Sequence, residues 1–251
     1  MSSRVQTALL ALLAVVAAAL TVLALRAPEP PVDTLGSARS SSARGFQATP
    51  SPSAKAVQPV VATAGRARPL VVVVGDSYAA GTGATAPRST AYPALIAADL
   101  TWDVRAAASP GAGYVVKGLG GPVIELLRRT PLARLDPDLV VLQAGHHDVT
   151  GDAEIAQIRG RVVEAVEAVR AAAPRAQVVV VGLLWPAAPP AGAAGADQAL
   201  RDAAASAGVL FTHTFDLRFP GVAGNRTDDS GHQRIAVRLE SSFRDLGLVT
   251  Q

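Results

Sequence analysis

Polar residues that could do chemistry follow three apolar runs of the chain, at the point where each run ends. They occupy residues 75–78 (Gly-Asp-Ser-Tyr), 109–114 (Ser-Pro-Gly-Ala-Gly-Tyr) and 145–148 (Gly-His-His-Asp). A serine placed directly after a buried strand and before a helix can expose its hydroxyl while nearby backbone N–H groups face a developing oxyanion. Ser77 has this context, and we therefore predict it as a nucleophile.

The apolar runs themselves have the composition of strands buried on both faces. Residues 71–74 and 178–181 are runs of valine, and residues 139–142 read Leu-Val-Val-Leu. Apolar residues recur at helical spacing from Ile155 to Val169. We also predict weaker strands at 102–107 and 209–215, and helices near 91–100, 122–129, 196–207 and 231–246. This alternation predicts one three-layer α/β domain with about five parallel strands, whose ligands bind beyond the carboxyl ends of the strands.

Residues 8–25 form an apolar run without charge or proline. Its length approaches the roughly 20 residues that a membrane-spanning helix needs. We therefore expect residues 1–26 to be a transmembrane anchor or a signal peptide. Residues 27–68 are rich in Pro, Ser, Ala, Thr and Gly and are expected to form a disordered tether, which leaves residues 69–251 for the folded domain. The domain would be extracytoplasmic and membrane-anchored, or secreted.

Composition excludes several classes of function. The net charge is only +3 and the arginines are scattered, so nucleic-acid binding is not expected. The chain has no cysteine, which excludes disulfides, thiolate metal sites and a cysteine nucleophile. The Gly-x-Gly run at 81–83 lies too far from the strand end for a dinucleotide loop, and no P-loop follows a strand. We expect neither a cofactor nor a metal.

The triplet Gly75-Asp76-Ser77 after residues 71–74, with the two later clusters at plausible distances, resembles the SGNH/GDSL hydrolases over about residues 69–246. This resemblance implies a flavodoxin-like sheet and hydrolysis of esters through an acyl-serine. The N–H groups of Ser77 and Gly111 would donate to the oxyanion. The third donor of that family is an asparagine, and His147 stands in its place; its imidazole N–H would be a bulkier, titratable donor. The alternative interpretation makes His146 and His147 ordinary polar loop residues.

The carboxy-terminal Asp-x-x-His block of this family can be aligned in two ways. In the first, Asp229 and His232 form the block, with His232 as the general base for Ser77 and Asp229 orienting it. In the second, residues 231–236 begin the helix that follows the block. The block then falls on Ala223 to Arg226, and both catalytic side chains are absent.

Two functions follow from these alignments. The first is an exported serine esterase, or acyl- or acetylhydrolase, acting on a small ester or on an acylated cell-envelope lipid or glycan. The second is a catalytically silent binding domain of the same fold on the cell surface, because a serine of ordinary pKa without a base is a poor nucleophile.

Overall fold

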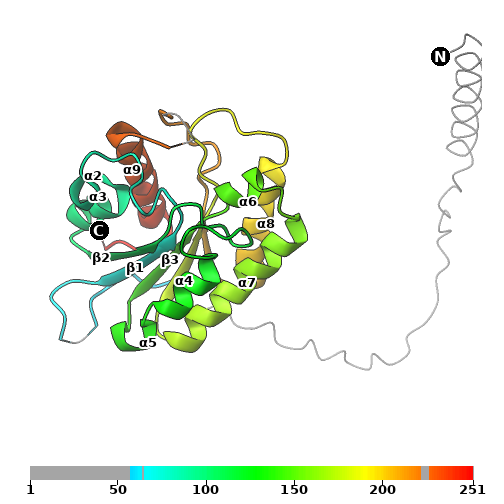
Figure 1. Ribbon diagram of the computed structural model, residues 1–251. Helices are drawn as coiled ribbons and strands as arrows, with labels where there is room; N and C mark the ends of the chain where they lie inside the picture. The colour runs from blue at the N-terminus through cyan, green and yellow to red at the C-terminus, as the bar shows by residue number, and fades with distance from the viewer. Residues whose placement is uncertain (1–56, 64, 222–225, 251) are drawn as a thin grey trace, which may run out of the picture. The chain divides into compact units, whose positions relative to one another are not determined.

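Five parallel strands form the centre of the domain in the computed structural model, which describes residues 57–63, 65–221 and 226–250. Their order across the sheet is β2-β1-β3-β4-β5, and Figure 1 labels the first three of them. The strands are β1 (Leu70–Gly75), β2 (Asp103–Ala108), β3 (Leu139–Gln143), β4 (Gln177–Val181) and β5 (Leu210–Thr212). The predicted α/β fold with five parallel strands is confirmed.

Alternation along the valine-rich strands creates two cores. Val72, Val74 and Val140 belong to the core on one face of the sheet, whereas Val71 and Val73 belong to the core on the other. Successive side chains of a strand point to opposite faces, so a run of valines supplies both cores at once. This explains why the central strands are continuously apolar rather than alternating.

Helices cover both faces of the sheet (Figure 1). The helices α4 (Val123–Arg129), α7 (Ile155–Ala172) and α8 (Ala193–Ser206) supply side chains to the first core. The helices α3 (Tyr92–Asp99) and α9 (Asp229–Asp245) supply side chains to the second. Three short helices, α2 (Pro87–Thr90), α5 (Leu132–Leu135) and α6 (His146–Thr150), lie in the connections.

Several predicted elements have different bounds, and two of these differences have a local reason. The strand predicted at 209–215 ends at Thr212, because the chain turns where the N–H of Leu217 donates to the carbonyl of Thr214. The helix predicted at 231–246 begins earlier, because the side chain of Asp228 accepts a hydrogen bond from the N–H of Gly231 and caps it.

The register of β1 with its neighbours brings the three polar clusters together. Gly75, the last residue of β1, pairs with Ala108 at the end of β2 and with Gln143 at the end of β3. Ser77, Gly111 and His147 follow these three strand ends within four residues. The sheet thus places all three on its carboxyl edge.

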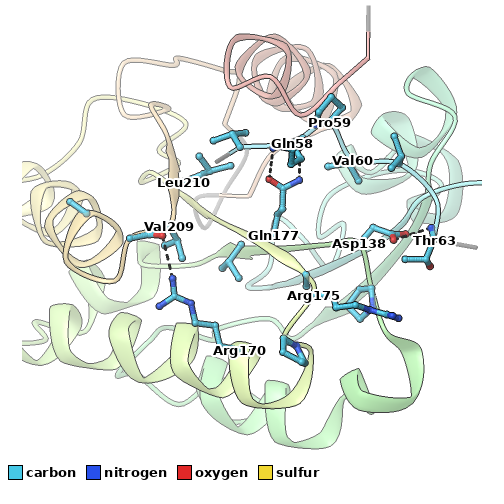
Figure 2. Close-up of a pocket in the computed structure, with 18 residues that line it drawn as sticks. Gln58, Pro59, Val60, Thr63, Asp138, Arg170, Arg175, Gln177, Val209 and Leu210 are labelled. Carbon is cyan, nitrogen blue, oxygen red and sulfur yellow. Dashed lines mark hydrogen bonds between the residues drawn. The ribbon is translucent and has the colours of Figure 1, made fainter. Parts of the chain in front are cut away.

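A segment before β1, residues 57–63 and 65–68, packs on the opposite, amino-terminal edge of the sheet; we call it the strap. Val60 is buried and its N–H donates to the carbonyl of Leu248. Gln58 exchanges two hydrogen bonds with Gln177, the first residue of β4 (Figure 2). These residues belong to the stretch that composition assigns to the tether, yet they are bonded to the domain.

The predicted amino-terminal anchor at 1–26 and most of the predicted tether lie outside the described residues. Within the part of the chain that the structure describes, no helix is long and apolar enough to cross a membrane.

Candidate active site

Ser77 lies immediately beyond β1, in a tight turn against the end of β3. The N–H of Asp76 donates to the carbonyl of Gln143 at 3.2 Å, which extends the pairing by one residue. A Cβ on Gly75 would lie 2.5 Å from the same carbonyl oxygen, so only glycine allows this close passage. The N–H of Thr82 donates to the carbonyl of Ser77, so the chain turns directly after the serine. Its side chain is half-buried.

Two backbone N–H groups at this edge are suited to an oxyanion. The N–H groups of Ser77 and Gly111 donate to no acceptor among the described residues. Gly111 has a φ of +84°, the left-handed region that favours glycine. Both groups were predicted as oxyanion donors, and the structure leaves both of them available.

Asp148 anchors the loop that carries Gly111. Its carboxylate accepts hydrogen bonds from the N–H groups of Tyr114 at 2.7 Å, Val115 at 2.9 Å and Val116 at 2.9 Å. Burial raises the pKa of Asp148, and these N–H groups oppose the rise. A Cβ on Gly113 would lie 2.2 Å from a carboxylate oxygen of Asp148. The anchoring role of Asp148 was not predicted from the sequence, although the glycines of residues 111–113 indicate a close backbone approach.

His147 contacts the predicted nucleophile directly. Its Nε2 lies 3.4 Å from the Oγ of Ser77. Gly145, with a φ of +116°, allows α6 to begin immediately after β3 and so brings the ring over the end of β1. Burial lowers the pKa of His147, and the charge of Asp148 raises it. The structure therefore pairs a serine hydroxyl with an imidazole.

His146 has a structural environment. Its ring stacks on Trp185 with centroids 4.1 Å apart and meets Tyr78 edge-on. Its Nδ1 lies 3.4 Å from the carbonyl oxygen of Leu184, to which only an N–H can donate. Burial lowers the pKa of His146 to about 4, so the ring is neutral at pH 7. His146 fills the core behind His147.

Asp229, predicted to orient the base, and His232, predicted as the base, form hydrogen bonds with groups other than Ser77. The carboxylate of Asp229 accepts hydrogen bonds from the N–H and hydroxyl of Thr85 and from the hydroxyl of Thr90. His232 is buried within α9, and its Nδ1 lies 3.4 Å from the N–H of Tyr92. Its Nε2 is also buried; burial lowers the pKa of His232, and an interaction with the backbone of Thr82 opposes this. Residues 223–225, on which the second alignment places the block, lie outside the described ranges.

A cavity of about 690 Å³ is lined by residues of the strap and of the strand starts, which Figure 2 shows as sticks. Its lining includes Asp138, Gln177 and Leu210, at or next to the first residues of β3, β4 and β5, together with residues of the strap. Ser77, Gly111 and His147 do not line it. The cavity is therefore not the place where the paired serine and imidazole would bind a substrate.

Comparison with known proteins gives a family and a set of similar folds. The profile of the GDSL-like Lipase/Acylhydrolase family matches residues 73–241. The chain is similar to the solved structure of TesA, with a TM-score of 0.54 and 21% identity over 70% of this chain and 99% of that one. A psychrotrophic esterase, EstA from Pseudoalteromonas sp., gives a TM-score of 0.54 and 13% identity over 70% of this chain and 97% of that one.

A family two carbohydrate esterase from Clostridium thermocellum, solved in complex with cellohexaose, gives a TM-score of 0.56 and 18% identity. That match covers 70% of this chain and 64% of the esterase. At such identities the structural likeness shows the fold. No curated protein matches the chain.

Proposed function

Because this chain belongs to the GDSL-like lipase/acylhydrolase family and is an ester-hydrolysing enzyme, we propose that it cleaves a carboxylic ester through an acyl intermediate on Ser77. The observation that carries this proposal is the Ser77 hydroxyl at the carboxyl edge of the sheet, 3.4 Å from an imidazole nitrogen. Contact between a hydroxyl and a potential base is the arrangement that nucleophilic catalysis requires.

The geometry supports attack on a planar ester carbonyl. As the Oγ of Ser77 bonds to the carbonyl carbon, negative charge develops on the carbonyl oxygen. The N–H groups of Ser77 and Gly111, which have no other acceptor among the described residues, would donate to that oxygen. A preorganised donor of this kind typically contributes on the order of 100- to 1000-fold in rate.

The substrate that we propose is a small acyl or acetyl ester carried by a cell-envelope glycan or lipid. The likeness to a carbohydrate esterase supports the glycan alternative. The apolar run at residues 8–25 supports export of the domain on an anchor or behind a signal peptide. Protease added to intact cells should degrade the domain if it is exported, whereas protection until the cells are lysed would overturn that part of the proposal.

Turnover of p-nitrophenyl acetate by the full chain tests the acyl-serine. Ser77→Ala should reduce kcat to the background rate, because no other hydroxyl replaces the nucleophile. Ser206→Ala is the matched control, since Ser206 is exposed at the end of α8 and donates only to the carbonyl of Ala203. Equal turnover by the wild type and Ser77→Ala would refute the proposal.

A further inference from the structure

The ring of His147 is the imidazole that reaches Ser77, and we propose that His147 is the general base of the reaction rather than an oxyanion donor. This inference rests on the proposed acyl-Ser77 mechanism and names the group that takes its proton. The separation of 3.4 Å between Oγ and Nε2 is longer than an ideal hydrogen bond. Catalytic contacts are often that loose before the substrate binds.

The histidine predicted as the base, His232, has its contacts with residues other than Ser77. His232 lies in α9 with its ring stacked on Tyr92 and its Nδ1 facing the N–H of that residue. The carboxylate that would orient it, Asp229, is occupied by Thr85 and Thr90. Among the described residues, His147 is the histidine whose ring forms a hydrogen-bond contact with the Ser77 hydroxyl.

One nitrogen cannot serve both roles at once. To accept the proton of Ser77, Nε2 must carry a lone pair, so the neutral ring must hold its proton on Nδ1. A ring in this form cannot donate from Nε2 to an oxyanion. The oxyanion then depends on the backbone N–H groups of Ser77 and Gly111.

Ser77 and His147 account for every proton transferred and every bond formed or broken in the reaction. The Oγ of Ser77 bonds to the carbonyl carbon as its proton moves to Nε2 of His147. The tetrahedral intermediate then breaks its bond to the alcohol oxygen, which takes the proton from Nε2. In the second half, water gives a proton to Nε2 and attacks the acyl carbon, and the Oγ of Ser77 leaves with that proton.

The groups around His147 keep its ring available as a base near neutral pH. His146 meets the ring edge-on from the same helix, with centroids 5.2 Å apart, and Asp148 follows it in α6. Burial lowers the pKa of His147 and outweighs the opposing charge of Asp148. Burial thus favours the neutral form of the ring, the form that can accept a proton.

The base works without a carboxylate partner. Asp148 is the adjacent acid, but its oxygens accept the N–H groups of Tyr114, Val115 and Val116. In serine–histidine–aspartate sites, replacing the aspartate by asparagine costs on the order of 10⁴-fold in kcat. We therefore expect slow turnover of unactivated esters and faster turnover of esters with good leaving groups.

His147→Asn separates the two roles, because asparagine donates a hydrogen bond but takes up no proton. If His147 is the base, kcat for p-nitrophenyl acetate should fall by about 100-fold or more, which is the usual contribution of a general base. His147→Gln should lose a similar factor. His213→Gln, at an exposed histidine beyond β5, is the control and should keep wild-type turnover. Retained or increased turnover by His147→Asn would show that His147 is a donor and would overturn the inference.

Two further measurements guard against a variant that is merely misfolded. Added imidazole should restore part of the turnover of His147→Ala, because the small base can enter the space of the missing ring. The rising limb of the pH profile of kcat/KM should be present in the wild type and absent from His147→Asn. A rescue failure in a cooperatively folded His147→Ala protein, together with an unchanged pH profile in His147→Asn, would overturn the inference.

His232→Gln decides between the two histidines. We expect a loss of less than about tenfold, since His232 packs within α9. A loss of about 1000-fold or more, with His147→Asn still active, would identify His232 as the base. If Ser77→Ala loses turnover but His147→Asn does not, this inference fails while the proposed function stands. If Ser77→Ala retains turnover, the proposed function itself fails.

Discussion

Asp148 and Gly113 show how residues without a chemical role shape the candidate site. The carboxylate of Asp148 lies under residues 114–116 and accepts three backbone N–H groups. This loop also carries Gly111, whose N–H is one of the two proposed oxyanion donors. The loop and the carboxylate can approach each other only because residue 113 has no side chain. The geometry at Ser77 therefore depends on the carboxylate of Asp148, which holds the loop that carries Gly111.

Gly113→Ala should damage both stability and turnover. The new Cβ would lie 2.2 Å from an oxygen of Asp148, so the loop must move and lose some of its hydrogen bonds. We expect a loss of about 1–3 kcal/mol in the free energy of unfolding and at least tenfold in kcat. Gly160→Ala is the control: its Cβ meets nothing within 4 Å in α7, and it should stabilise the protein by about 0.5–1 kcal/mol. Equal denaturation curves for the two variants would contradict this account.

Asp76→Asn should alter the pH dependence of stability. Burial raises the pKa of Asp76 from 3.8 to about 7, against the opposing hydrogen bond from the N–H of Tyr78. The folded state holds the proton where the unfolded state releases it, so this contribution is complete below about pH 4 and is lost as the pH rises to about 7. A change from 3.8 to about 7 corresponds to on the order of 4 kcal/mol.

The readout is the difference between the unfolding free energies of the wild type and Asp76→Asn, measured by urea denaturation from pH 4 to 8. Relative to the variant, the wild type should become less stable up to about pH 7. His146, whose pKa is lowered to about 4, contributes the opposite slope in both proteins and cancels. Asp245→Asn changes an exposed acid and should leave the slope unchanged. A pH-independent difference between the wild type and Asp76→Asn would refute the buried-acid account.

At the scale of elements, the sequence predicts the strands and helices that a repeating pattern of apolar residues produces. It does not predict contacts that depend on a single hydrogen bond or a single ring. The valine runs and the helical spacing of residues 155–169 predict the sheet and α7, because burial of many side chains imposes a period. The same pattern places Ser77, Gly111 and His147 on one edge. It does not show which nitrogen faces which oxygen. Asp229 and His232 have the spacing of a catalytic pair, yet one carboxylate bonded to Thr85 and Thr90 and one ring packed against Tyr92 give them another environment.

Asp229 fastens α9 to the segment between Ser77 and α3. Asp229→Asn replaces one acceptor oxygen with an amide that cannot accept from Thr85 or Thr90. We expect the midpoint of urea denaturation to fall, because these hydrogen bonds weaken, and hydrogen exchange to accelerate in residues 79–91. Turnover of p-nitrophenyl acetate should fall by less than about tenfold. A loss near 10⁴-fold in kcat with unchanged stability would instead place Asp229 beside a catalytic histidine.

At the scale of the whole domain, the strap and the candidate site occupy opposite edges of the sheet. The strap crosses the starts of the strands, where Arg66 forms an ion pair with Asp138 at 3.1 Å and Thr63 donates to the same carboxylate. Ser77 lies beyond the end of β1. The composition of residues 57–68 does not reveal this docking, because a few buried side chains within a stretch of small and polar residues produce no period.

Val60 and Val61 provide a matched test of whether the strap stabilises the domain. Val60 is 5% exposed and packs in the core that α3 and α9 cover, whereas Val61 is 60% exposed. Removing buried methyl groups costs the lost transfer free energy and leaves a cavity. Val60→Ala should therefore lower the free energy of unfolding by about 1–2 kcal/mol, and Val61→Ala should change it by less than about 0.5 kcal/mol. Both variants should keep wild-type kcat, because the site lies at the other edge.

Equal stability of the two variants in urea denaturation would mean that the strap is not part of the cooperative fold. A selective loss of kcat in Val60→Ala would mean instead that the two edges are coupled through the sheet.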